Sequence, residues 1–321
     1  MSQKTLTPGR WRGLKTTSTA DNIFTILAFD QRGTYRKMLP PAATYDDAVR
    51  IKRDVVVALS AHTSAVLLDN TYGLPSALEM SGASGLLMAL EESGYTGDST
   101  YRKIQFDPDW TVEKIKKMGG SAVKLLAYYH PHSGALADEI DGVVAEVAAE
   151  CHRFDLPLFL EPVSYSLDAA ISKDSAEFAA TRPEVVRLTA ERLSKLDVDV
   201  LKLEFPVDAA FNSDEAFWQE ACNAVGAVCS VPWVLLSAGV AFETFEKQVE
   251  IACRAGASGF LAGRAIWKEA VTMSAGDMAA FLAGTAAERV ERLAKVAKAH
   301  ARPWTQLYAP HPASTDWYKT Y

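Results

Sequence analysis

A lysine lies inside a stretch of sequence that otherwise has the composition of a buried β-strand. Lys202 stands between Leu201 and Leu203 in the run Asp199-Val-Leu-Lys-Leu-Glu-Phe205. Desolvating an unpaired ammonium group is costly, so a lysine in such a strand is expected to be neutralised, paired or used in chemistry. Burial also lowers the pKa of a lysine, which makes its amine a nucleophile near neutral pH. The segment therefore predicts an enzyme that forms a Schiff base.

Other apolar segments carry charged residues in the same way. The three residues concerned are Asp30, Lys124 and Glu161. Because side chains alternate along a strand, Lys202 and Glu204 are expected to face the same way, and Lys124 and Glu161 to meet them. A single buried Lys–Glu pair is often only structural, but charges on four predicted strands favour a catalytic site. Glu204 is the weakest member, because Pro206 indicates the strand end; it is expected to balance a lysine or bind a loop.

These residue types suit imine formation. Lys202 would attack a ketone carbonyl, while Lys124 keeps it partly deprotonated through like-charge repulsion. Glu161 would protonate the hydroxyl group that leaves the carbinolamine. The resulting iminium is an electron sink, so it stabilises the carbanion left when a carbon–carbon bond breaks.

An anion site is predicted after two further strands. The small residues Ser237, Ala238 and Gly239 follow one of them, and Gly263 and Arg264 follow the other. Small residues let backbone N–H groups approach an anion, and an arginine adds a charged donor. In an α/β barrel, the loops after the seventh and eighth strands frequently bind phosphate.

A metal-dependent site is a weaker alternative. His130 and His132 follow one predicted strand and offer two imidazoles. The remaining histidines fall in predicted helices or tails: His62, His152, His300 and His311. We therefore predict neither a metal ion nor a cofactor.

The elements that must position these residues alternate between strands and helices. Near-continuous apolar strands separated by amphipathic helices predict a parallel sheet covered on its outer face. The strands are predicted at Phe24–Asp30, Ala65–Asp69, Leu86–Leu90, Ala122–Ala127, Pro157–Val163, Val200–Phe205, Trp233–Ala238 and Gly259–Gly263. Helices are predicted at Tyr45–Leu59, Leu136–Phe154, Pro183–Leu196 and Phe242–Ala255.

Eight such strands predict an α/β fold of the (β/α)8 TIM-barrel type. We expect a single domain over residues 1–321, with a C-terminal extension after about residue 302 that packs on the barrel or at a subunit interface. The segment 90–117 is the least regular; it contains a loop at 91–98 and is expected to reach over the barrel mouth.

Composition excludes several classes of partner. The chain has 321 residues, 49% of them hydrophobic, and a net charge of −7 without a basic stripe, so neither nucleic acid nor a membrane surface is an expected partner. Four cysteines show no CxxC spacing and are expected to be reduced thiols. The N-terminus lacks the apolar core of a signal peptide, so a cytoplasmic location is expected.

Seven ordered blocks over about residues 20–270 resemble the class I tagatose 1,6-bisphosphate aldolase family. The blocks are Ile26–Gly33, Leu67–Pro75, Val123–Tyr129, Phe159–Glu161, Asp199–Pro206, Leu236–Val240 and Gly263–Trp267. The resemblance implies a metal-free aldolase on a (β/α)8 barrel that cleaves a ketohexose bisphosphate. The products would be dihydroxyacetone phosphate and glyceraldehyde 3-phosphate. Dimers and tetramers are common among relatives, so a homo-oligomer is expected.

The resemblance also implies roles for individual residues. Lys202 matches the family's Schiff-base lysine and Glu161 its acid/base glutamate, with Asp30 and Lys124 as assisting residues; Asp30 would help to manage the C4 hydroxyl proton. The region that holds the C1 phosphate matches Ser237, Ala238, Gly239, Gly263 and Arg264. Gln31 and Arg32 are expected on the opposite side, at the distal end of the substrate.

Two alternatives remain open at this point. The sulfofructose-phosphate aldolases are similar in the block Ala255–Trp267, so 6-deoxy-6-sulfofructose 1-phosphate is a second candidate substrate. Gly33 and Tyr72–Pro75 instead favour the tagatose branch. A non-catalytic sugar-phosphate sensor is a third possibility. The intact set of charged residues argues against it, because replacing a costly buried charge often stabilises a fold.

Overall fold

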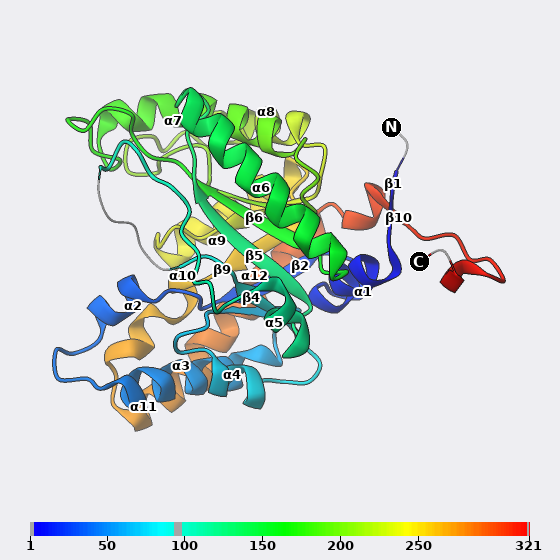
Figure 1. The fold of residues 1–321 in the computed structure, drawn as a ribbon. Helices are drawn as coiled ribbons and strands as arrows, with labels where there is room; N and C mark the ends of the chain where they lie inside the picture. Colours follow the sequence, from blue (N-terminus) through cyan, green and yellow to red (C-terminus); the bar gives the residue numbers. More distant parts are fainter. Residues whose placement is uncertain (1–2, 93–97, 320) are drawn as a thin grey trace.

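The computed structural model describes residues 3–92, 98–319 and 321, and eight parallel strands within them close into a barrel (Figure 1). The predicted (β/α)8 fold is therefore confirmed, with strand ends that differ from the predicted ones by one or two residues. The strands are β2 (Phe24–Ala28), β3 (Ala65–Leu68), β4 (Gly85–Ala89), β5 (Ala122–Tyr128), β6 (Leu158–Val163), β7 (Val200–Leu203), β8 (Trp233–Leu236) and β9 (Gly259–Ala262).

The barrel closes where β9 pairs with β2 and Gly259 lies opposite Phe24. Gly259 has φ +129°, in the region that favours glycine. A Cβ at this position would lie only 1.9 Å from the carbonyl oxygen of Phe24. A side chain at residue 259 would therefore push the two closing strands apart.

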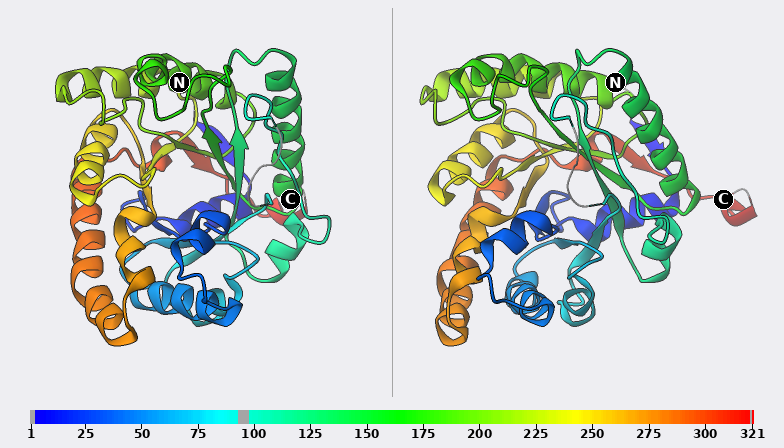
Figure 2. Two further views of the ribbon diagram at one scale, coloured as in Figure 1. Left: turned by 90° about the vertical axis from the view of Figure 1, so that its left-hand side faces the viewer. Right: turned by 60° about the vertical axis from the view of Figure 1, so that its left-hand side comes forward.

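The helices form an outer ring around the strands (Figure 2). The longer ones are α3 (Tyr45–Ser60), α6 (Ala135–Arg153), α7 (Ala176–Leu193), α8 (Glu215–Val228), α9 (Phe242–Arg254) and α12 (Ala287–His300). The shorter ones are α2 (Gly33–Met38), α4 (Leu74–Glu79), α5 (Val112–Lys117), α10 (Arg264–Trp267) and α11 (Ala275–Phe281). The helices predicted at Tyr45–Leu59, Leu136–Phe154 and Phe242–Ala255 agree with α3, α6 and α9 to within one residue.

Helix α7 differs from the sequence-based prediction. It was expected to begin at Pro183 but begins at Ala176, and Pro183 lies inside it. The side chain of Ser175 accepts a hydrogen bond from the N–H of Phe178 and so starts the helix two turns earlier. The prediction gave proline its common first-turn position, whereas here a serine cap determines where the helix starts.

The two ends of the chain cover the amino-terminal end of the barrel. Strand β1 (Lys4–Leu6) pairs with β10 (Tyr308–Pro310), and helix α1 (Pro8–Thr17) inserts Leu14 into the inner core beside Phe24 and Phe159. Arg10 of α1 donates two hydrogen bonds to the fully buried Asp199, at 2.6 and 3.1 Å. This buried ion pair therefore anchors helix α1 to Asp199, the residue that precedes β7.

The segment between β4 and β5 reaches the opposite end of the barrel. The predicted loop at 91–98 lies partly outside the described residues, which omit 93–97. Beyond it, the guanidinium of Arg102 lies 4.6 Å from the ring centre of Tyr128 and 5.7 Å from that of Tyr165. Tyr128 ends β5, so the described part of this segment lies at the mouth.

All four cysteines are free thiols. Among the described residues, no helix combines the length and the hydropathy needed to cross a lipid bilayer.

Candidate active site

Four predicted site residues converge inside the carboxyl-terminal half of the barrel. Lys202 lies on β7, Glu161 on β6 and Lys124 on β5, while Asp30 follows β2. All four are less than a tenth exposed. Alternation along each strand directs every second side chain inward, which is how residues far apart in sequence meet.

The four side chains form one continuous series of ion pairs. Lys202 Nζ lies 2.8 Å from Glu161 Oε1, and Glu161 Oε2 lies 2.9 Å from Lys124 Nζ. Lys124 Nζ in turn lies 2.8 Å from Asp30 Oδ2. Glu161 therefore bridges the two lysines and is in position to exchange a proton with Lys202.

Glu91 completes the set, and the sequence analysis missed it. Its Oε1 lies 2.8 Å from Lys124 Nζ, and its Oε2 accepts the backbone N–H of Leu126 at 2.9 Å. The sequence pattern places Glu91 in the loop at 91–98. The period-two pattern Leu87, Ala89, Glu91 was the available signal, because it continues the inward face of β4 by one residue.

Electrostatics fix the charge states at the far end of the series. Burial alone would lower the pKa of Lys124, but the surrounding carboxylates of Asp30, Glu161 and Glu91 raise it well above its ordinary value. Burial alone would likewise raise the pKa of Asp30, but the charges of Lys124 and Lys202 hold it below its usual range. Lys124 is therefore a fixed cation and Asp30 a fixed anion at neutral pH.

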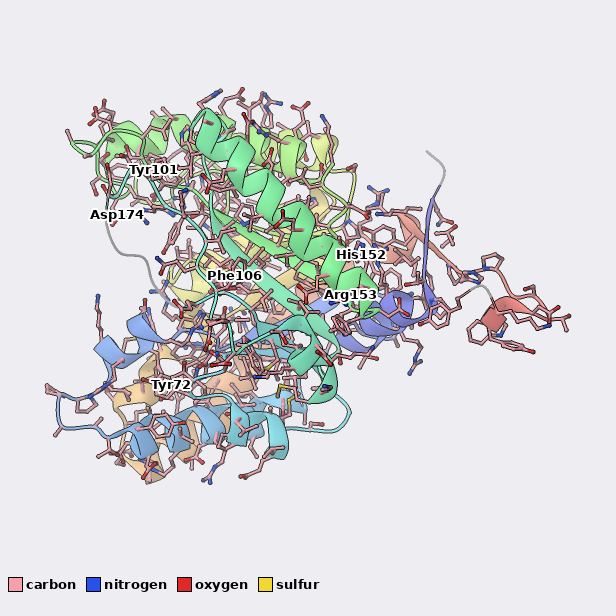
Figure 3. The ribbon with its side chains drawn as sticks, in the orientation of Figure 1. Tyr72, Tyr101, Phe106, His152, Arg153 and Asp174 are labelled. Carbon is pink, nitrogen blue, oxygen red and sulfur yellow. The ribbon has the colours of Figure 1, made fainter. Side chains whose placement is uncertain are left out.

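A cavity of about 530 Å3 opens above this series. Lys202 and Glu161 line it, whereas Lys124 and Asp30 lie behind Glu161 and are not among the lining residues. Asp174 also lines the cavity and marks the mouth in Figure 3, opposite the end of the barrel where His152 is labelled. A substrate in this cavity would meet the amine of Lys202 and the carboxyl group of Glu161 first.

The predicted anion loops form another wall of the cavity, and Ser237, Ala238, Gly239, Gly263 and Arg264 all line it. The Ser237 hydroxyl accepts the N–H of Gly263 at 3.2 Å, and Arg264 Nη2 donates to the Ala238 carbonyl at 3.1 Å. Ala238 has φ +46°, an uncommon conformation that this arginine contact supports. Arg264 is thus both part of the wall and a brace for the loop.

Gly239 leaves the space that the guanidinium occupies. Its φ is +87°, and a Cβ there would lie 2.8 Å from Arg264 Cζ. Burial also lowers the pKa of Arg264, which indicates a guanidinium held partly away from solvent. A cation in that setting is favourably placed to bind an anionic group.

Gln31 and Arg32 are separated in the structure. Gln31 lines the cavity beside the anion loops: a Cβ on Gly263 would lie 3.4 Å from Gln31 Nε2. This differs from the expected position opposite these loops, because closure of the barrel makes β2 the neighbour of β9. Arg32 does not line the cavity; it donates at 3.3 Å to Asn70 Oδ1 and at 3.3 Å to Glu91 Oε1.

Glu204 lines the cavity but binds a loop. Its carboxylate accepts the backbone N–H of Ser164 at 2.7 Å and pairs with Lys173 at 2.7 Å and Arg182 at 3.3 Å. Burial would raise the pKa of Glu204, but the two cations lower it to about 2. Glu204 therefore ties the segment after β6 to the cavity wall.

His130 Nδ1 accepts the backbone N–H of His132 at 3.2 Å. Within residues 3–92, 98–319 and 321, no three His, Cys, Asp or Glu side chains are arranged to hold a metal ion.

Comparison with known proteins identifies relatives over most of the chain. The model of the DeoC/LacD family aldolases matches residues 24–269. A Listeria monocytogenes protein named tagatose 1,6-diphosphate aldolase is 34% identical, over 94% of this chain and 96% of the relative. An Enterococcus faecalis protein named tagatose 1,6-diphosphate aldolase 2 is also 34% identical, over 94% of this chain and 97% of the relative.

Solved structures share the fold at lower sequence identity. An archaeal fructose 1,6-bisphosphate aldolase superposes with a TM-score of 0.58 at 21% identity, covering 89% of this chain and 98% of that one. Cgl0159 from Corynebacterium glutamicum superposes with a TM-score of 0.62 at 16% identity, covering 91% of this chain and 90% of that one. These likenesses support the barrel architecture described above.

Proposed function

The chain belongs to the DeoC/LacD aldolase family, and from that premise we propose that it is a Schiff-base aldolase that cleaves a C1-phosphorylated ketohexose. The observation that carries this proposal is the series of ion pairs Lys202–Glu161–Lys124–Asp30 beneath the cavity. A nucleophilic lysine in contact with a proton-transfer group is the arrangement that imine chemistry requires.

The first half of the reaction uses Lys202 and Glu161. The Lys202 ammonium group transfers a proton to Glu161, 2.8 Å away, and the free amine attacks the ketone carbon C2. A proton then moves from the nitrogen to the C2 oxygen, which gives the carbinolamine. Glu161 returns the proton to the C2 hydroxyl, which leaves as water, and the nitrogen lone pair forms the C=N bond of the iminium. Glu161 is then a carboxylate again, still held by Lys124 at 2.9 Å.

The second half breaks the C3–C4 bond. Glu161 accepts the C4 hydroxyl proton, assisted by Asp30, to which Lys124 connects it. The C4 oxygen forms the carbonyl of the released aldehyde, and the C3–C4 electrons move into the iminium to give an enamine. Glu161 then returns this proton to C3 of the enamine. Addition of water to the resulting iminium releases dihydroxyacetone phosphate and restores Lys202. The buried Oδ1 of Asp30 accepts no hydrogen bond from the described residues, so its negative charge is available to assist the transfer of the C4 hydroxyl proton electrostatically.

We assign the C1 phosphate to the wall formed by Ser237, Gly239, Gly263 and Arg264, with the Gln31 amide beside it. This places a cation and small residues at the end of the cavity where barrel enzymes commonly bind phosphate. Arg32 would reach the distal end of the substrate only by leaving Asn70 and Glu91.

Tagatose 1,6-bisphosphate is the proposed substrate, supported by the names of the relatives and by their coverage of nearly the whole chain. The test is dihydroxyacetone phosphate release from this compound and from 6-deoxy-6-sulfofructose 1-phosphate, compared as kcat/KM in EDTA. We expect full activity in EDTA, because the iminium itself supplies the electron sink. We also expect a preference for the bisphosphate, in line with the names of the relatives.

Each alternative outcome of that comparison has a distinct meaning. Preference for the sulfonate would change the substrate and keep the Lys202 chemistry. Activity lost in EDTA and restored by a divalent metal would contradict the imine mechanism. Release from neither compound would contradict the proposed substrate class.

Arg264→Met is expected to raise KM for either substrate and to lower kcat/KM by roughly 10- to 100-fold. A charge-assisted hydrogen bond of about 1.5–3 kcal/mol is lost, and the loop at Ala238 loses its brace. Steady-state kinetics at fixed pH measure this effect. Arg254→Met, which removes the exposed ion pair with Glu250 on α9, is the matched control. An unchanged KM in Arg264→Met would remove the arginine from the phosphate site.

A further inference from the structure

A second buried lysine lies outside the series of catalytic ion pairs. Lys52 on helix α3 is fully buried, although a lysine on an amphipathic outer helix is normally solvated. Its ammonium group lies between three aromatic rings, 4.5 Å from the ring centre of Phe29, 5.3 Å from Tyr35 and 5.6 Å from Tyr72. Tyr72 is labelled in Figure 3. Burial at this cost requires a set of compensating contacts.

All three N–H donors of Lys52 have acceptors, and two of these acceptors belong to the loop that carries Asp30. Lys52 Nζ forms a buried ion pair with Asp69 and donates to the carbonyl oxygens of Phe29 at 2.7 Å and Gln31 at 3.2 Å. These two carbonyls lie immediately before and after Asp30 in the chain. Lys52 therefore holds the backbone on both sides of Asp30.

Asp69 extends this anchoring to a second loop. Its Oδ1 accepts the backbone N–H groups of Thr71 and Tyr72, both at 2.8 Å. The Oδ1 of Asn70, the residue between Asp69 and Thr71, accepts a hydrogen bond from the Arg32 guanidinium. The Lys52–Asp69 pair thus joins the loop after β2 to the loop after β3.

The position of Asp30 depends on this arrangement. Asp30 Oδ2 contacts Lys124 at 2.8 Å, and the side chain of the next residue, Gln31, lines the cavity. Loss of the Lys52 donors would free both flanking carbonyls and allow this loop to move. A displacement of about 1 Å can cost a catalytic step about 10²-fold.

We propose that Lys52 is a positioning residue for carbon–carbon bond cleavage, acting through Asp30 and Gln31 without touching the substrate. The inference rests on the proposed function, because it assigns Asp30 to the cleavage step. Imine formation depends on Lys202 and Glu161, neither of which Lys52 contacts. The two partial reactions should therefore respond differently to its loss.

The test compares two rates in the purified full-length protein carrying Lys52→Met. Ketose cleavage at saturating tagatose 1,6-bisphosphate reports the step that needs Asp30. Borohydride trapping at saturating dihydroxyacetone phosphate reports imine formation alone, because saturation removes any effect of Gln31 on phosphate binding. We expect the cleavage kcat to fall about 10- to 100-fold while the trapping rate stays at the wild-type value.

A matched control and a double-mutant cycle separate positioning from stability. Arg10→Met breaks a comparably buried ion pair at the opposite end of the barrel, so it should lower Tm without changing the ratio of cleavage to trapping. The double variant Lys52→Met/Asp30→Asn should cleave the ketose no more slowly than Asp30→Asn alone, because both substitutions act through the Asp30 carboxylate.

Each result supports or overturns the proposal. The proposal is overturned if cleavage and trapping fall equally or if neither falls. It is also overturned if the losses of cleavage in the double variant are additive. If Lys52→Met does not fold, the same rates are measured in Lys52→Met with Asp69→Asn, which leaves no unpaired buried carboxylate. Absence of trapping and cleavage in the wild-type protein would instead overturn the proposed function.

Discussion

Replacing Lys202 with alanine is expected to abolish ketose cleavage while the barrel remains folded. Without the amine, no imine forms and the C3–C4 electrons have no acceptor, so kcat/KM should fall on the order of 10⁴-fold or more. The fold should survive because Glu161 keeps its ion pair with Lys124 at 2.9 Å. Steady-state kinetics with tagatose 1,6-bisphosphate in EDTA measure the loss of cleavage. A thermal unfolding curve shows whether the variant is folded.

Lys202→Arg is the matched control for charge at this position. It keeps a cation near Glu161 but supplies no nucleophilic amine, because a guanidinium stays protonated in proteins. We expect the same loss of cleavage as in the alanine variant. Substantial activity in either folded variant would mean that another group forms the covalent intermediate, or that none is formed.

Glu161→Gln is expected to lower kcat by about 10²- to 10⁴-fold, the usual contribution of a positioned acid–base group. Glutamine has nearly the same size but cannot exchange the proton that the carbinolamine and the C4 hydroxyl require. Lys202 would also lose its partner at 2.8 Å. Borohydride trapping should slow together with cleavage, which distinguishes this variant from Lys52→Met.

The control for Glu161→Gln is Glu269→Gln, which removes a partly buried carboxylate paired with Arg289 at 2.9 Å, outside the cavity. That variant should keep full activity. If Glu161→Gln cleaves within a few-fold of the wild-type rate, the proton must travel through a different group. The assignment of both proton transfers to Glu161 would then be wrong.

The barrel and four of its buried charges could be predicted from sequence because strand signals are local. Apolar runs such as Val200–Leu203 identify strands, and a lysine within one is conspicuous against its neighbours. Inward alternation then predicts that Lys202 and Glu161 approach each other, and they are 2.8 Å apart. Parallel closure places all the strand ends at one mouth, so no long-range information was needed for this part.

Other parts of the site depend on contacts that no local pattern contains. Glu91 stands beside Glu92 just past the end of β4, where two acidic residues indicate a solvated loop. Lys52 occupies a position where an amphipathic helix commonly carries an exposed lysine, and only tertiary packing buries it. The pairing of β1 with β10 joins the two ends of the chain and is equally invisible to a reading along the sequence.

The separation of Gln31 from Arg32 has the same origin. The two residues are adjacent in sequence, yet the Gln31 amide lies near Gly263 while Arg32 contacts Asn70 and Glu91. Their neighbours come from the loop after β9 on one side and from the loops after β3 and β4 on the other. The sequence analysis predicted both residues at one end of the substrate, because the sequence alone does not show which strands become neighbours when the barrel closes.

The most direct test of the account is to treat the protein with borohydride in the presence of dihydroxyacetone phosphate and to locate the adduct by peptide mass spectrometry. The account predicts irreversible inactivation and a single reduced adduct on the peptide that contains Lys202, in EDTA as well as without it. An adduct on Lys124 or Lys52, or full activity with no adduct after treatment, would contradict it.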